Sequence, residues 1–183
     1  MSFMDVTCRD SFSLPNCAGC SGCGGDMLRV GCGYETYLYF ELPPAVWLGR
    51  LQKARLFLFK ISADAAGAPL SKIDRYRVCP LLDFASVFGD CFAPPGIDER
   101  LCAPFEDDSR RSYTEIDVTG IAKAWTLEKP ENKGLVLSGH PSARPLVYAS
   151  NRFAVAGMRP TLRLSCEGFT RPLSVAEAVA EVR

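Results

Sequence analysis

Short runs in which apolar and polar residues alternate dominate the chain. In YETYLYFEL, at residues 34–42, every second residue from Leu38 onward is apolar, and the residues between them face the other side. In ARLFLFKI, Ala54, Leu56 and Leu58 share one face in the same way. A period of two is typical of a β-strand with one buried face. Further short strands are predicted in DSFSL, MLRV, GLVLSG, PLVYAS and PTLRLSC.

Turn residues separate these predicted strands. They are LPP at 42–44, GAP at 67–69, PPG at 94–96, KPEN at 129–132 and HPSARP at 140–145. Short strands spaced in this way predict an all-β fold, a β-sandwich. The segment DVTGIAKAW instead predicts one short helix near residues 119–125: Thr119 can cap it, and Ile121 and Trp125 fall on one face. Trp125 is therefore expected in the core.

Composition and charge exclude several classes of protein. The 21 basic and 21 acidic residues cancel without forming runs, so we expect no nucleic-acid partner. No window resembles a membrane span, and the first residues do not resemble a secretory signal peptide. His140 is the only histidine, and neither a serine nucleophile elbow nor a glycine-rich phosphate loop is present. We therefore expect a protein that is not an enzyme and needs no cofactor. Asp107 and Asp108 are read as a solvated charge run rather than a calcium site.

Nine cysteines are the anomaly of this composition. Three of them, Cys17, Cys20 and Cys23, stand at intervals of three in CAGCSGCGG, and Cys32 follows in RVGCGY. These four could ligate one metal ion, although their spacing fits neither the common iron–sulfur run nor the paired zinc motif. The alternative is a disulfide-forming protein that leaves the cytosol without a classical signal peptide. In that case three further cysteines, Cys79, Cys91 and Cys102, could tie down the weakly patterned segment 79–111.

The order of these patterns resembles the DNRLRE domain family, a jelly-roll-like β-sandwich of surface proteins that is related to some carbohydrate-binding modules. The resemblance covers about residues 10–166 and rests on DSFSL, MLRVG, YLYFELP, ARLFLF, DVTGIAKAW, NKGLVL and YASN…RPTLRLS. It implies a jelly-roll-type sandwich and a surface-attached, polysaccharide-binding or structural role, without a common catalytic activity. We accordingly expect a single domain over 1–168, with a cysteine-rich loop at 16–25. The remaining residues 169–183 would form a C-terminal tail, with a short helix in SVAEAVAEVR as an option.

The chain departs from the family that it resembles at one end of the sandwich, where members usually carry a short polar loop and this sequence has the cysteine-rich loop. Bridges between residues three apart close strained rings, so at least one of Cys17, Cys20 and Cys23 is expected to pair outside the loop. Its partner would be Cys32 or a cysteine of an adjacent subunit, and we predict intermolecular disulfides. Cys8 precedes the first predicted strand and Cys166 ends the last, so terminal strands lying side by side would allow an intramolecular bridge between them.

Four aromatic side chains lie on the outward faces of two predicted strands: Tyr37, Tyr39, Phe57 and Phe59. If the strands share a sheet, these rings form a surface for a glycan or a neighbouring subunit, unless another segment covers it. The function predicted first is a structural subunit that self-associates into a disulfide-reinforced assembly, of filament type, on a cell or spore surface. The alternatives are a carbohydrate-binding module that uses the aromatic face and a sandwich domain with a four-cysteine metal site.

Overall fold

The computed structural model describes residues 2–15, 25–43, 51–61, 75–86, 94–108 and 110–167. The strands in these segments are β1 (Ser2–Thr7), β2 (Asp10–Pro15), β3 (Met27–Val30), β4 (Tyr34–Tyr39), β5 (Leu51–Phe59), β6 (Tyr76–Pro80), β7 (Ala103–Phe105), β8 (Tyr113–Asp117), β9 (Leu135–Gly139), β10 (Leu146–Ala149) and β11 (Thr161–Cys166). The helix is α2 (Thr119–Thr126), and single 3₁₀ turns lie at Glu99–Leu101 and Ala156–Met158.

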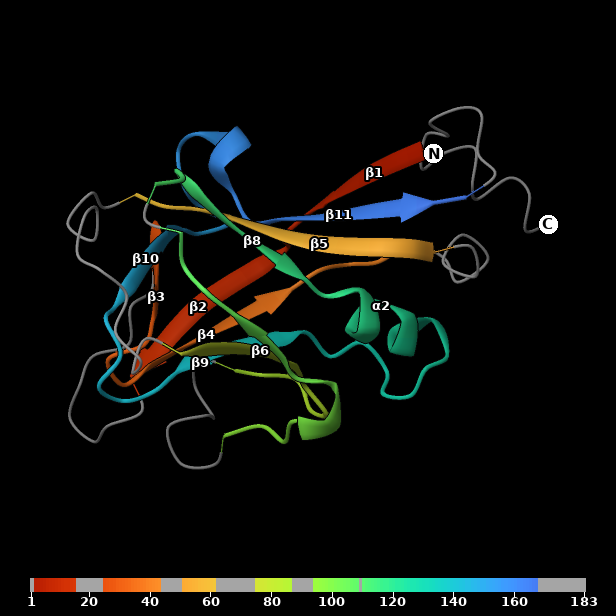
Figure 1. Ribbon diagram of the computed structural model, residues 1–183, viewed down its shortest axis with the longest axis horizontal. Helices are drawn as coiled ribbons and strands as arrows, with labels where there is room; N and C mark the ends of the chain where they lie inside the picture. The colour runs from red at the N-terminus through yellow and green to blue at the C-terminus, as the bar shows by residue number, and fades with distance from the viewer. Residues whose placement is uncertain are drawn as a thin grey trace.

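Two antiparallel sheets form the layers of a β-sandwich (Figure 1). The four-stranded sheet has the order β1-β11-β5-β8, and the five-stranded sheet has the order β2-β4-β9-β6-β7. The strands β10 and β3 pair separately at one end. The prediction of an all-β sandwich with one short helix is therefore confirmed.

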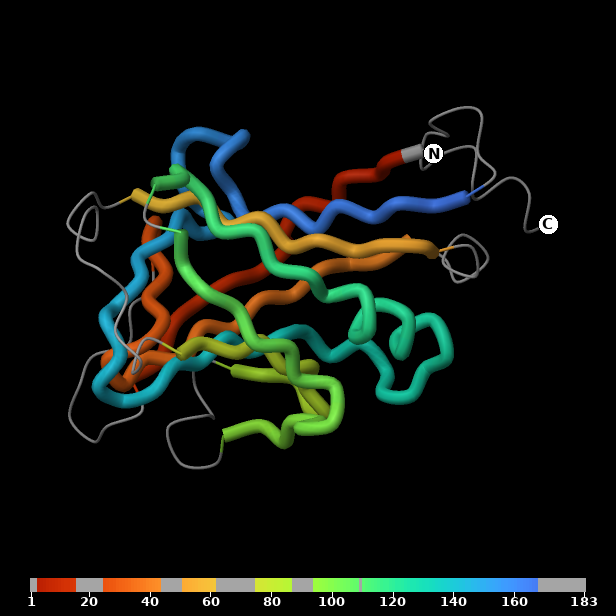
Figure 2. Tube along the Cα trace, in the orientation of Figure 1, coloured from red at the N-terminus to blue at the C-terminus, as the bar shows by residue number. Residues whose placement is uncertain are grey.

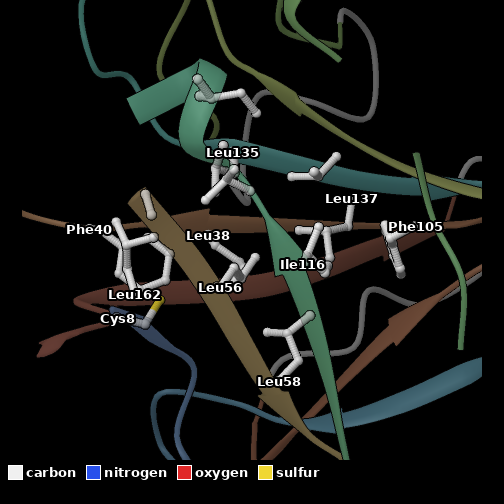
Figure 3. Packing of buried hydrophobic residues seen from close by; sticks show 14 of the residues in the cluster. Cys8, Leu38, Phe40, Leu56, Leu58, Phe105, Ile116, Leu135, Leu137 and Leu162 are labelled. Atoms are coloured by element: carbon white, nitrogen blue, oxygen red, sulfur yellow. The ribbon is translucent and has the colours of Figure 1, made fainter. Parts of the chain in front are cut away.

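The core lies between the two sheets. Figure 3 shows Leu56 and Leu58 of β5 together with Ile116 and Leu162 from the four-stranded sheet, near Leu38 of β4 and Leu137 of β9. The alternation predicted for β5 is correct, because Ala54, Leu56 and Leu58 are fully buried while the residues between them stay partly accessible. The segments DSFSL, MLRV, GLVLSG, PLVYAS and PTLRLSC all form strands as predicted.

The first strand of the structure was not anticipated from the sequence. β1 precedes DSFSL and pairs antiparallel with β11, so the two run side by side along the trace in Figure 2. Between β1 and β2 the chain passes from one sheet to the other. The Cys8 N–H donates to the Pro160 carbonyl beside β11, and the Arg9 N–H donates to the Tyr39 carbonyl of β4. A single bend at these two residues therefore links the layers.

The helix α2 lies between the ends of the two sheets and buries Ile121, Ala122 and Trp125 (Figure 1). The prediction that Trp125 anchors the core is confirmed. The capping role predicted for Thr119 is wrong. Its hydroxyl accepts a hydrogen bond from the Ala54 N–H of β5 at 3.0 Å, and the Thr119 N–H instead donates to Asp117 Oδ1 at 2.9 Å. The hydroxyl thus connects the helix to the sheet rather than closing its own first turn.

Candidate functional site

Cys79 and Cys102 form a disulfide, with Sγ atoms 1.96 Å and Cα atoms 4.2 Å apart. Cys79 lies in β6 and Cys102 lies just before β7, and both pack in the apolar cluster on the outer face of the five-stranded sheet. A disulfide that closes a loop of this size stabilises the fold by about 3 kcal/mol, because it restricts the conformations of the unfolded chain. Cys79 and Cys102 were both predicted to tie this segment down, whereas Cys91 lies outside the described residues.

The predicted bridge between Cys8 and Cys166 is wrong. The terminal strands do run antiparallel, but Cys166 lies opposite Ser2, and Cys8 lies beside Pro160 at the other end of the ladder. Six residues at about 3.3 Å each separate the two positions, far beyond the reach of a disulfide. Both thiols are free and buried. Burial raises the pKa of the Cys8 thiol to about 12 and also raises the pKa of Cys166, so both behave as small apolar side chains.

Cys32 is the exposed thiol among the free cysteines of the described segments. It lies at the tip of a two-residue turn in which Gly31 and Tyr34 exchange backbone hydrogen bonds of 3.1 and 3.2 Å. Cys32 and Gly33 have φ values of 53° and 78°. Two successive positive φ angles match the twist of the flanking strands but are unfavourable for a residue with a side chain. The fold therefore holds this thiol outward on a tight turn.

The cysteine-rich loop itself, with Cys17, Cys20 and Cys23, lies outside the described residues. Pro15, the last described residue before it, pairs with Tyr34 at the end of β2. The loop consequently begins beside the turn that carries Cys32. No group of three or more potential metal ligands occurs in the segments that the structure describes. The four-cysteine metal site depends on the three undescribed cysteines, so it stays an alternative.

The predicted common aromatic surface is wrong. Tyr37 and Tyr39 belong to β4 in the five-stranded sheet, and Phe57 and Phe59 belong to β5 in the four-stranded sheet. Outward residues of these two strands point away from opposite layers of the sandwich. Strands that follow each other in the sequence here lie in different sheets, so the four rings form two separate groups.

The first group lines a hollow of about 230 Å³ on the outer face of the five-stranded sheet. Tyr37 is buried and stacks on Phe12 with ring centroids 5.1 Å apart, while Tyr39 meets Phe84 edge to face at 5.9 Å. The Lys133 ammonium lies 4.4 Å from the centre of the Phe84 ring. The lining residues are Asp10, Phe12, Tyr37, Leu38, Tyr39, Leu81, Phe84, Ala85 and Lys133. Aromatic walls with one acidic and one basic side chain suit a small, polar ring compound.

The second group is a half-buried strip on the outer face of the four-stranded sheet. Tyr113 of β8 lies 5.8 Å from the ring of Phe57 and 5.8 Å from that of Phe59. The Arg163 guanidinium of β11 covers Phe57 at 5.1 Å. The rings thus contact one another and a cation.

A buried charge cluster surrounds Asp107, for which the sequence predicted a solvated side chain. That prediction is wrong for Asp107, whose side chain is 0% exposed, and it holds for the exposed Asp108. The Asp107 carboxylate lies 2.5 Å from Lys60 Nζ and 3.3 Å from an Arg144 guanidinium nitrogen, and Thr114 donates to it at 3.1 Å. One buried carboxylate between two cations thus joins three segments of the fold. Phe105 faces the core two residues earlier, and this spacing was the signal in the sequence.

His140 lies in an exposed turn, where its Nδ1 accepts a hydrogen bond from the Ser142 N–H at 3.2 Å. Among the described residues, no helix is long and apolar enough to cross a membrane.

In the comparisons with known proteins, no protein-family model and no curated sequence matches this chain. The DNRLRE resemblance therefore rests on the sequence patterns alone and stays a prediction.

Proposed function

We propose that this protein is a non-catalytic structural subunit that self-associates at a cell or spore surface and is reinforced by disulfides. The observation that carries the proposal is the exposed thiol of Cys32, held outward on a strained turn. The same chain has an internal disulfide between Cys79 and Cys102, which is the bonding state favoured outside the cytosol. A DNRLRE-like surface domain would provide such a setting.

An exposed thiol next to the start of a loop with three more cysteines favours bonds between molecules. Cys8 and Cys166 are buried, so they are protected from this reaction, and Cys79 and Cys102 are already paired. The thiols available for cross-linking are therefore Cys32 and those of the undescribed segments. A rigid sandwich that presents Cys32 on an exposed turn can join its copies covalently.

Gel electrophoresis of the oxidised protein, with and without reductant, tests this proposal. We expect high-mass material that reductant converts to the monomer. Replacing Cys32 together with Cys17, Cys20 and Cys23 by serine should yield assemblies that dissolve without reductant. Cys166→Ser is the matched control, because its thiol is buried, and it should leave the ladder of species unchanged. Monomeric oxidised protein, or stoichiometric zinc or iron lost in the quadruple variant, would contradict the proposal.

A second candidate function, carbohydrate binding, is favoured by the hollow beside Tyr39 and Phe84. Aromatic faces stack on sugar rings, and Asp10 and Lys133 could accept from and donate to sugar hydroxyls. Retention on a polysaccharide gel that Tyr39→Ala abolishes and Phe57→Ala preserves would favour this function. Passage of the unmodified protein through all gels tried would exclude it.

A further inference from the structure

The strand β1 forms the edge of the four-stranded sheet. Among the described strands it pairs with β11 alone. The Cys8 N–H donates to the Pro160 carbonyl at 2.9 Å, which fixes the alternation of the ladder. Since antiparallel strands direct the backbone groups of alternate residues to opposite sides, the N–H and C=O groups of Phe3, Asp5 and Thr7 point away from β11. No described segment pairs with these groups, so within the described part of the chain they are available to a further strand.

This edge lacks the features with which proteins usually block strand addition. It contains no proline and no lysine, and its ladder with β11 is regular. Its one charged residue, Asp5, is neutralised by two hydrogen bonds from Arg163, of 2.7 and 2.8 Å. Phe3 is 59% exposed.

The other outer strands of the two main sheets carry such protection. β7 is three residues long and contains Pro104, and β8 carries two acidic residues, Glu115, which pairs with Arg55, and the exposed Asp117. In β2, the central side chains are buried, and Ser13 binds the Arg29 N–H of the crossing strand β3 at 2.8 Å. β1 is thus the least protected edge of these sheets.

We propose that β1 pairs with β1 of a second copy, antiparallel and across a twofold axis, to form one continuous eight-stranded sheet. This inference rests on the proposed function, since it names the non-covalent contact of the self-associating subunit. The register places Phe3 opposite Asp5 of the second copy and brings the two Met4 side chains together. It matches the outward N–H and C=O groups of residues 3 and 5 in both copies, giving four hydrogen bonds.

Side-chain chemistry favours this partner over a foreign strand or β8 of another copy. Met4 and Val6 are only half-buried on the inner face, so a second β1 would extend the apolar layer there. Each Asp5 keeps its own Arg163 and meets an aromatic ring rather than a second carboxylate. Pairing with β8 would instead bring Asp5 toward the exposed Asp117, and the repulsion between two carboxylates disfavours that arrangement.

An edge of six residues buries little surface, so the isolated contact is weak and depends on protein concentration. Disulfides between copies would raise the effective concentration of neighbouring edges and strengthen it. The edge therefore orders the copies, and the thiols hold them together.

Sedimentation of the full chain in reducing buffer, over a concentration series, measures this contact without disulfides. We expect a monomer–dimer equilibrium. Phe3→Pro removes an outward N–H and none of the bonds to β11, and should raise the dimer Kd by roughly tenfold or more, since two hydrogen bonds are lost per dimer. Leu127→Lys removes an apolar side chain that directly follows α2 and is 71% exposed, and it should leave the Kd unchanged.

The register has its own test. Under mild oxidation, Met4→Cys should give a disulfide between the introduced thiols of the two copies, which peptide mapping identifies, because facing residues of a non-hydrogen-bonded pair lie about 4.5 Å apart. Asp5→Cys should not cross-link to itself. The reverse pattern would overturn the register.

Three results would overturn the edge contact: a monomer at every concentration, a dimer that Phe3→Pro leaves intact, or slow hydrogen exchange at residues 3, 5 and 7 in the dilute monomer. The last would show that another segment of the chain covers the edge. A reversible dimer without disulfide-linked material would contradict the proposed function and not the edge. Cross-linked material built from chains that are monomeric in reductant would contradict the edge contact and not the proposed function.

Discussion

Removing the charge of the buried Asp107 carboxylate is expected to destabilise the protein far more than the same change at its exposed neighbour Asp108. Asp107→Asn keeps the size of the side chain and an oxygen that can still accept from Thr114. It removes the negative charge between Lys60 and Arg144, whose side chains are only 13% and 16% exposed. The change therefore isolates the electrostatic role of the carboxylate.

Leaving a buried ion without its partner destabilises proteins by about 3–5 kcal/mol. Lys60 and Arg144 keep some contact with water, so we expect a loss near the lower end, about 3 kcal/mol. Domains are stable by only about 5–15 kcal/mol, so this loss is a large part of the total. In urea, with a slope of about 2 kcal/mol/M, the midpoint of unfolding should fall by about 1.5 M.

Equilibrium urea unfolding of the full chain, followed by tryptophan fluorescence, measures the loss. Asp108→Asn is the matched control: Asp108 is exposed and pairs with Arg111, so its loss should stay within about 0.5 kcal/mol. The double variant Lys60→Met/Asp107→Asn should lose less than the sum of the two single variants, because the uncompensated ammonium is gone. Equal midpoints for Asp107→Asn and Asp108→Asn would refute the reasoning.

Two further predictions concern the backbone and pH. Gly134 has φ +110°, and an added Cβ would lie 2.8 Å from the Leu38 carbonyl, so Gly134→Ala should lower the free energy of unfolding by more than about 1 kcal/mol. The control is Gly120→Ala in α2, whose added Cβ meets nothing within 4 Å, and it should raise the free energy of unfolding by about 0.5–1 kcal/mol. Thermal unfolding measures both changes, and a Gly134→Ala protein as stable as the unmodified one would contradict this reasoning. Hydrogen bonds from Arg163 hold the pKa of the Asp5 carboxyl below its ordinary value, so the pair stabilises the fold above about pH 4 and is lost as the pH falls through the folded-state pKa. Asp5→Asn should therefore lower the free energy of unfolding at pH 7 by up to about 1 kcal/mol, a small value because both partners are half-exposed. The difference from the unmodified protein should vanish in acid. A difference that does not change with pH would argue against the ion pair.

The local pattern of the sequence predicted seven of the eleven described strands, but not β1, β6, β7 or β8. Alternation in β5 predicted its buried face correctly, and the spacing of Ile121 and Trp125 predicted the helix and its core side. These features depend on the backbone period of each element, which is visible in a few consecutive residues.

Only the tertiary structure decided which strands share a sheet. Tyr39 and Phe57 look like neighbours in the sequence, yet β4 and β5 lie in opposite layers, and their rings serve different surfaces. Strand pairing is a long-range choice that depends on hydrogen bonds between distant segments, and the period of a single strand does not encode it. The same choice set the register of β1 against β11 and thereby kept Cys8 away from Cys166.

The buried charge at Asp107 was also decided by the tertiary structure. The composition of the run FEDD predicts solvated side chains. Asp107 is buried only because the fold brings Lys60 and Arg144 to its carboxylate. A carboxylate is stable in the interior when cations from other segments reach it, and those segments are separated by tens of residues in the chain. Cys32 depended on both the sequence and the tertiary structure. The sequence marked it as a candidate thiol, and the turn between β3 and β4 placed it outward.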